Sequence, residues 1–307
     1  MRLLLMALAL LAAASSSSRQ QASVSLQGLT VYAINGEALP GTTVTLSRDG
    51  RRAAETHTTR NGSYQFSDLS AGDYSVTFSL PGFIEVSCNV QINPGRTASA
   101  IGALALNGFD VGEPGPSDER RRLCFVDGEV PVFLEYANAD RRGSVLILVA
   151  DVGRAPRAAA QFLKQVDASA FDKGTIRRIP TPPMQGAAGR APRDPSGATS
   201  VIEVRLPPAT GAPLQTASLE TTRVSGLSHR AGTLTVPQAV AGAAGVPAFL
   251  IMLEDDPSFD AGGGRYVNRE GAAAFGRVAM RVAGLKGLES APFTIVSIKR
   301  AGWEQRR

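Results

Sequence analysis

Short runs of alternating apolar and polar residues, separated by turn dipeptides, fill the first third of this 307-residue chain. Apolar residues recur at every second position in Val44–Leu46, Tyr64–Phe66, Tyr74–Leu80 and Val86–Ile92. A period of two is that of a β-strand with one buried face. Turn signals lie between the runs, at Asn35-Gly36, Pro40-Gly41, Asn61-Gly62, Ala71-Gly72, Pro81-Gly82 and Pro94-Gly95. The pattern predicts an all-β sandwich of two packed sheets over residues 23–108.

Within this region, four stretches carry a family resemblance: Ala38–Leu46, Thr59–Phe66, Leu69–Tyr74 and Pro81–Phe83. They resemble the carboxypeptidase regulatory-like family. The resemblance implies a transthyretin-like sandwich that serves as a non-catalytic module beside another domain. His57 has no partner nearby for chemistry, which agrees with that role.

The second half of the chain mixes strand and helix signals. Val145–Val149 is an apolar run of a length that suits a buried strand. Pro156 suits the first turn of a helix, where no backbone N–H is needed. One face of that helix is apolar, with Ala159, Phe162, Leu163 and Val166. Further strands are predicted at 201–206, 232–236, 248–253, 275–278 and 293–298, and a second helix at 277–288.

A series of ordered segments then carries a second resemblance. They are Gly143–Leu148, Ala155–Leu163, Gly174–Ile179, Gly226–His229, Gly232–Leu234, Phe249–Ile251, Asp255–Asp260, Ala274–Val278 and Ser297–Arg300. Together they resemble the bacterial branch of the cyclophilin-type peptidyl-prolyl cis–trans isomerases. The resemblance implies a mainly-β closed barrel capped by two helices over residues 128–307, and an isomerase activity.

Isomerisation of an X–Pro bond requires no nucleophile and no metal. Rotation breaks amide resonance, so the catalyst must grip the proline ring and stabilise the twisted imide by hydrogen bonding. In cyclophilins an arginine supplies that bond, and Arg178 matches it, although an ordinary surface arginine is the alternative. The substrate-binding residues that the resemblance implies are Met184, Gln185, Phe249, Leu250 and Phe259.

Several positions depart from the family pattern. Leu250 stands where a second pocket phenylalanine is usual, Ala272 replaces a histidine or aromatic residue, and Ser258 replaces a frequent tryptophan. The glutamine that holds the substrate carbonyl is either Gln185 or absent, with Leu206 in its place. These departures motivate an alternative: a catalytically weak or inactive cyclophilin-fold module that binds proline-containing peptides in the cell envelope.

Other chemistries find little support in the sequence. The net charge is +5, but the arginines are scattered, and a solvated surface explains them better than nucleic-acid binding. The acids around Asp255 and Asp256 are explained as loop residues, and Gly262–Gly264 as a flexible loop. No Ser/His/Asp grouping occurs, and His229 is interpreted as structural. We expect no metal, no cofactor and a monomer.

The N-terminus predicts export. Arg2, the apolar run Leu3–Ala14 and small residues after it are typical of a secretory signal peptide over residues 1–22. With no later transmembrane segment and no lipid-anchor cysteine, we expect a periplasmic or extracellular location. Residues 109–127 have linker composition, so two domains on a partly stiff joint are expected. Cys88 is predicted to face a core. An oxidising compartment would permit a disulfide between Cys88 and Cys124, but two unpaired thiols are the preferred interpretation.

The leading hypothesis is therefore an exported isomerase that assists folding of proline-containing proteins. The weak or inactive binding module is the second hypothesis. A third assigns the function to the sandwich, as a cell-surface adhesion or spacer element.

Overall fold

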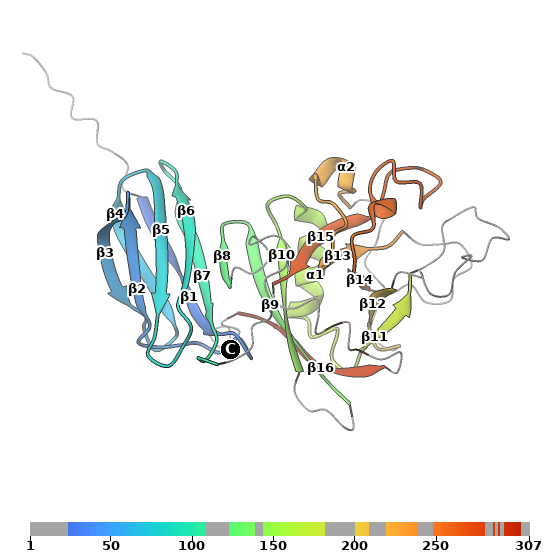
Figure 1. Ribbon diagram of the computed structural model, residues 1–307, viewed down its shortest axis with the longest axis horizontal. Helices are drawn as coiled ribbons and strands as arrows, with labels where there is room; N and C mark the ends of the chain where they lie inside the picture. The colour runs from blue at the N-terminus through green and yellow to red at the C-terminus, as the bar shows by residue number, and fades with distance from the viewer. Residues whose placement is uncertain are drawn as a thin grey trace, which may run out of the picture.

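The structure is a computed structural model that describes residues 24–108, 123–138, 144–181, 200–208, 219–238, 248–279, 285, 288 and 292–301. A β-sandwich and a closed β-barrel lie side by side (Figure 1). The predicted signal peptide and residues 109–122 of the predicted linker lie outside the described residues. The predicted fold class, a sandwich followed by a mainly-β barrel, is confirmed.

Each sheet of the sandwich has four strands. The first contains, in order, β4 (Ser63–Leu69), β1 (Val24–Tyr32), β7 (Ala98–Leu104) and β8 (Cys124–Val126). The second contains β3 (Arg51–His57), β2 (Thr43–Arg48), β5 (Gly72–Ser79) and β6 (Val86–Ile92). The alternating residues point inward as predicted, and β6 is buried at every second position. Gly62 has a φ of 69°, as a turn at this position requires, and the turn leads from β3 in one sheet to β4 in the other, so it does not close a hairpin.

The barrel closes through eight strands. Their order is β10 (Ser144–Asp151), β15 (Ala273–Val278), β13 (Thr233–Val236), β14 (Phe249–Met252), β12 (Ser200–Arg205), β11 (Thr175–Pro180), β16 (Phe293–Arg300) and β9 (Glu129–Ala137). The paired strands are antiparallel. Side chains therefore alternate between a packed interior and an outer face.

The interior is closed by helix α1 (Pro156–Asp167) (Figure 1). Pro156 begins the helix, and the predicted face, with Phe162 and Leu163, is buried in the barrel core. Shorter helical turns are α2 (Thr222–Ser225) and η3 (Pro257–Phe259). Most of the second helix predicted at 277–288 lies outside the described residues, and its first two residues belong to β15. Leu285 and Leu288 are nevertheless buried in the barrel core.

The two domains are joined more firmly than the linker composition predicted. β8 lies inside that stretch, yet it adds a strand to the sandwich by pairing with β7. Phe133 and Ile147, on the outer face of the barrel, belong to the same buried cluster as the sandwich core. The Phe133 ring lies against Gly36, where a β-carbon would come within 2.6 Å of it. The domains therefore share an apolar interface.

A disulfide bond reinforces this connection. Cys88 on β6 is bonded to Cys124 on β8, so the prediction of two unpaired thiols is wrong, while the predicted burial of Cys88 is confirmed. The pairing arises because β8 folds back onto β7 and places Cys124 opposite Gly102, on the inner face of its sheet. The pairing of β8 with β7 joins segments that are separated along the chain, so the local sequence around each cysteine does not specify it.

Candidate functional site

The two arginines of β11 lie on opposite faces of the barrel wall. Arg178 is paired with Ile202, a core residue, so its side chain is on the inner face, near the end of the strand. It is half-buried, and its Nη2 donates to Ser200 Oγ at 3.1 Å. Arg177 is paired with Glu203 and lies on the outer face. Arg178, the predicted catalytic arginine, and its neighbour Arg177 therefore lie on opposite faces of the barrel wall.

On the outer face, Arg177 belongs to a charged trio. Its Nε donates to Glu203 Oε2 at 2.9 Å, and Arg205 Nη2 donates to Glu203 Oε1 at 2.7 Å. The Glu203 side chain is only 3% exposed, whereas those of Arg177 and Arg205 are 39% and 32% exposed. Two cations against one buried anion leave an excess positive charge at the rim of this face.

This arrangement sets the charge state of Glu203. Burial by itself raises the pKa of a carboxyl group, but hydrogen bonds from Arg205 and Arg177, with their positive charges, outweigh it and lower the pKa of Glu203. The hydrogen bond between Arg205 and Glu203 raises the pKa of Arg205. Glu203 is therefore an anion that holds its two arginines in place.

An apolar cluster lies on the same face, beside the trio. Glu203 is paired with Leu250 on β14, and Val201 is paired with Met252. The cluster contains Val201, Leu250, Met252, Phe259, Tyr266 and Ala272, with Ile179 packed against it. Each of the six is at most 5% exposed. The outer wall of β11, β12 and β14 thus combines a guanidinium with a closed apolar patch.

The structure brings some of the predicted site residues together and separates others. Leu250 and Phe259 share the outer cluster. Phe249 lies in the barrel core, where its ring contacts Phe162, so it belongs to the interior. Arg178 lies on the inner face and is not brought to Leu250 or Phe259. Met184 and Gln185 lie outside the described residues.

Sequence reasoning missed Arg177, Glu203 and Tyr266. Glu203 stands directly across from Arg177, in the row that also holds Leu250. Strand alternation contained a usable signal, because Ile176 and Ile179 had to face opposite sides and therefore so did the two arginines. No comparable signal pointed to Tyr266, which lies in a glycine-rich loop.

His229 is structural, as predicted. Its Nδ1 is 2.7 Å from Asp260 Oδ1 and its Nε2 is 2.9 Å from Thr235 Oγ1, so both ring nitrogens have partners. Its ring also packs on Phe259 at a centroid distance of 5.4 Å. Among the described residues, no group of three or more His, Cys, Asp or Glu is placed to hold a metal ion. Nor is any described helix long and apolar enough to cross a membrane.

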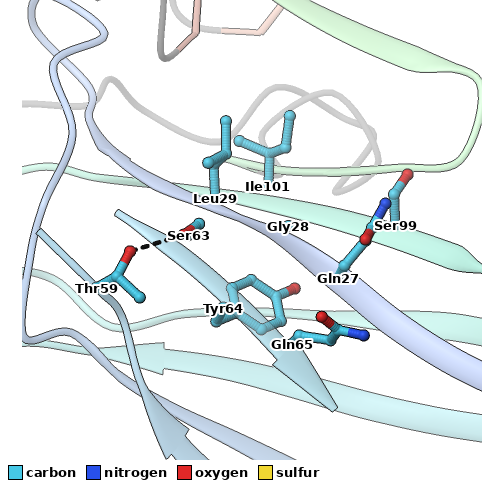
Figure 2. Close-up of a pocket in the computed structure, with 9 residues that line it drawn as sticks. All are labelled: Gln27, Gly28, Leu29, Thr59, Ser63, Tyr64, Gln65, Ser99 and Ile101. Carbon is cyan, nitrogen blue, oxygen red and sulfur yellow. Dashed lines mark hydrogen bonds between the residues drawn. The ribbon is translucent and has the colours of Figure 1, made fainter. Parts of the chain in front are cut away.

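A separate hollow of about 470 Å³ lies on the sandwich, over β1, β4 and β7 (Figure 2). It is lined by Gln27, Gly28, Leu29, Thr59, Ser63, Tyr64, Gln65, Ser99 and Ile101. None of these side chains is charged at neutral pH, and burial raises the pKa of Tyr64 further. The Tyr64 hydroxyl donates to the Ala100 carbonyl at 2.9 Å. The hollow is a neutral surface without the guanidinium that isomerase chemistry needs.

Comparison with known proteins identifies the first domain. The family model for the carboxypeptidase regulatory-like domain matches residues 25–105. Residues 25–105 form a carboxypeptidase regulatory-like domain. The resemblance stated from the sequence is thereby confirmed for the sandwich. No curated protein matches the chain.

Three solved structures resemble parts of the chain. GBS52, the minor pilin of Streptococcus agalactiae, is 18% identical with a TM-score of 0.22, over 31% of this chain and 46% of its own. The Bacillus anthracis TIE protein is 14% identical with a TM-score of 0.26, over 42% of this chain and 28% of its own. The cyclophilin AquaCyp293 from Hirschia baltica is 16% identical with a TM-score of 0.31, over 55% of this chain and 72% of its own. The chain spans less than half the length of the first two. The domain that follows the carboxypeptidase regulatory-like domain is a closed barrel of eight strands.

The low pKa of Glu203 predicts a pH dependence of stability. The pKa of Glu203 is lower in the folded than in the unfolded state, where a glutamate has a pKa of about 4.3. The ionised carboxylate therefore stabilises the fold at pH values above the unfolded-state pKa, and this stabilisation is lost as the pH falls through the folded-state pKa. Because its arginines are partly exposed, we expect about 1 kcal/mol. Unfolding of the wild type between pH 6 and pH 3 should therefore show a steeper loss than that of Glu203→Gln. Glu254→Gln, which removes an exposed carboxylate, should unfold like the wild type; identical curves for wild type and Glu203→Gln would contradict the assignment.

Proposed function

We propose that this is an exported protein whose cyclophilin-like barrel binds proline-containing polypeptide segments on its outer face and isomerises their X–Pro bonds slowly. The observation that carries the proposal is the engagement of Arg177 by the buried Glu203. Arg177 lies on the face that also bears the apolar cluster.

The physical reason is that a buried carboxylate already engages the guanidinium of Arg177. In the twisted state of an X–Pro bond the imide nitrogen accepts a hydrogen bond, and only interactions stronger in that state accelerate rotation. The Nε of Arg177 already donates to a carboxylate, in a charge-assisted bond of about 1.5–3 kcal/mol. The carboxylate offsets part of the positive charge that would stabilise the transition state. This loss of charge weakens catalysis more than it weakens binding of the proline ring to the apolar cluster.

Full isomerase activity is the second candidate function, and one observation favours it. Arg177, Glu203 and Leu250 form a continuous row across β11, β12 and β14. A guanidinium and an apolar side chain in one row is the combination that isomerisation requires. In this alternative Arg177 leaves Glu203 when substrate binds, and the activity is that of an efficient catalyst assisting the folding of exported proteins.

Export is supported by two features of the chain. The N-terminal pattern of Arg2 and the apolar run Leu3–Ala14 is typical of a signal peptide. The disulfide between Cys88 and Cys124 suits an oxidising compartment. The proposed partners are therefore proline-containing segments of envelope or secreted proteins.

Rates of cis–trans exchange in a short Ala-Pro peptide, measured by NMR exchange spectroscopy, test the proposal. We expect a weak acceleration by the wild type. Glu203→Gln removes the competing charge while keeping an oxygen acceptor, and should raise the rate roughly tenfold, the equivalent of about 1.4 kcal/mol. Arg177→Ala should abolish the acceleration.

Arg178→Ala is the matched control, because it removes the adjacent guanidinium from the opposite face of the same strand. Circular dichroism should verify that all three variants are folded. Activity lost in Arg178→Ala but kept in Arg177→Ala would overturn the assignment of the site. A fast wild-type rate that Glu203→Gln leaves unchanged would favour the second candidate.

A further inference from the structure

The loop between η3 and β15 covers the outer apolar cluster. It runs from Ala261 to Gly271, and in its middle Arg265 and Tyr266 are only 8% and 5% exposed. Their neighbour Val267 is 75% exposed, so the loop turns two long side chains inward and one apolar side chain outward. Burial on this scale in a glycine-rich loop indicates a specific packed arrangement of Arg265 and Tyr266.

We infer that Tyr266 occupies the pocket that receives the proline ring, so that the barrel opens this site only when the loop 261–271 swings away. The inference rests on the proposed function of the outer face. In this role Tyr266 controls access of the substrate to the pocket and its specificity for proline. The pocket holds the phenol ring of Tyr266 in the closed state and a proline ring of the substrate in the open state.

Contacts of the tyrosine support this role. Its ring meets that of Phe259 edge to face, at a centroid distance of 6.3 Å, and it belongs to the same cluster as Leu250. Burial raises the pKa of Tyr266 to about 12, against a smaller opposing effect of a hydrogen bond with the backbone of Gln238. The phenol is therefore neutral and shares a buried cluster with Leu250 and Phe259, two of the residues proposed to bind the substrate. An X–Pro ligand has to displace it to reach them.

Arg265 fastens the loop next to the tyrosine. Its guanidinium lies over the Phe259 ring, 4.1 Å from the centroid, and its Nη2 donates to Asp256 Oδ2 at 3.1 Å. Its Nε donates to Ser258 Oγ at 2.9 Å. These bonds all reach residues of η3 or its cap, so one short segment holds the closed state.

Glycines flank the covering residues on both sides. Gly262 and Gly264 have φ values of 85° and 86° before Arg265, and Gly271 has a φ of 76° after Tyr266. Residues at such angles without a β-carbon tolerate the backbone rotation that loop opening demands. Beyond Gly271, the Ala272 N–H donates to the Phe259 carbonyl at 2.8 Å, so the base of the loop stays attached while its middle moves.

The experiment is a fluorescence anisotropy titration of the full chain with a fluorescein-labelled Ala-Ala-Pro-Ala peptide. When the binding-competent state is only a fraction of the population, the apparent affinity falls by that fraction. Tyr266→Ala should therefore bind at least about tenfold more tightly than the wild type. Tyr266→Phe keeps the ring and should bind like the wild type. Val267→Ala, which shortens the exposed neighbour, should also leave affinity unchanged.

A second measurement does not depend on a variant that must fold. Hydrogen exchange of the wild type should show faster exchange of the Gly263 and Arg265 amides when unlabelled peptide is added, because both are hydrogen-bonded in the closed loop, to the Asp260 and Ser258 carbonyls. Equal affinities of wild type and Tyr266→Ala, or exchange unaffected by bound peptide, would overturn the covering role and leave the proposed function standing. Absence of peptide binding by every variant would overturn the proposed function itself, and the inference with it.

Discussion

Removing the disulfide between Cys88 and Cys124 is expected to lower the free energy of unfolding of the sandwich by about 4 kcal/mol. The magnitude follows from the loop that the bond closes, which spans a sequence separation of 36 residues and restricts the unfolded chain. The double substitution Cys88→Ala and Cys124→Ala tests it, because alanine introduces no buried hydroxyl. Urea unfolding followed by tyrosine fluorescence gives the measurement.

The consequence extends to the connection between the domains. β8 has three residues and is followed within a few positions by β9, the first strand of the barrel. Without the bond, amides of β8 should exchange faster than those of β7. Reducing agent should destabilise the wild type and leave the double variant unaffected. Two free thiols in the denatured, non-reduced wild type would show that the bond is absent and would restore the prediction made from sequence.

The second large effect is expected at the centre of the barrel. Phe162 of α1 is fully buried, with its ring centroid 5.8, 5.4 and 5.2 Å from those of Phe171, Phe249 and Phe275. Phe162→Ala removes the side chain through which the helix closes the barrel, and should cost about 3–5 kcal/mol. Thermal unfolding of the variant should show the loss in the barrel transition.

Gln161→Ala is its matched control, one position earlier on the same helix and only partly buried. It should change stability by no more than about 0.5 kcal/mol. A cost below about 1 kcal/mol for Phe162→Ala would mean that the four rings do not form the packed core described here.

The two arginines show where prediction from sequence met its limit. A strand inverts its faces when its register shifts by one residue, and Arg177 and Arg178 differ by one residue. Matching of the segment before Ile179 favoured Arg178, while pairing with β12 assigns the outer face to Arg177. The register is fixed by partners more than twenty residues away along the chain, so the segment alone does not determine it.

The covering loop shows a different limit. Gly262–Gly264 has the composition of a flexible loop, and no periodic pattern surrounds it. Its order comes from Arg265 and Tyr266. Nothing in the local sequence indicates a structural role for them, and that role depends on their contacts with Phe259. Loops of this kind are ordered by side chains that dock elsewhere, and composition describes only their backbone.

The amino-acid sequence by itself determined the alternation of the sandwich strands, the turn at Asn61-Gly62 and the buried face of α1, because each follows from short-range periodicity and backbone stereochemistry. The tertiary structure decided the pairing of Cys88 with Cys124, the face on which each arginine lies and the covering of Leu250 by a distant loop. These features depend on which strands pair with one another, and strand pairing is fixed by the packing of segments that are far apart in the sequence.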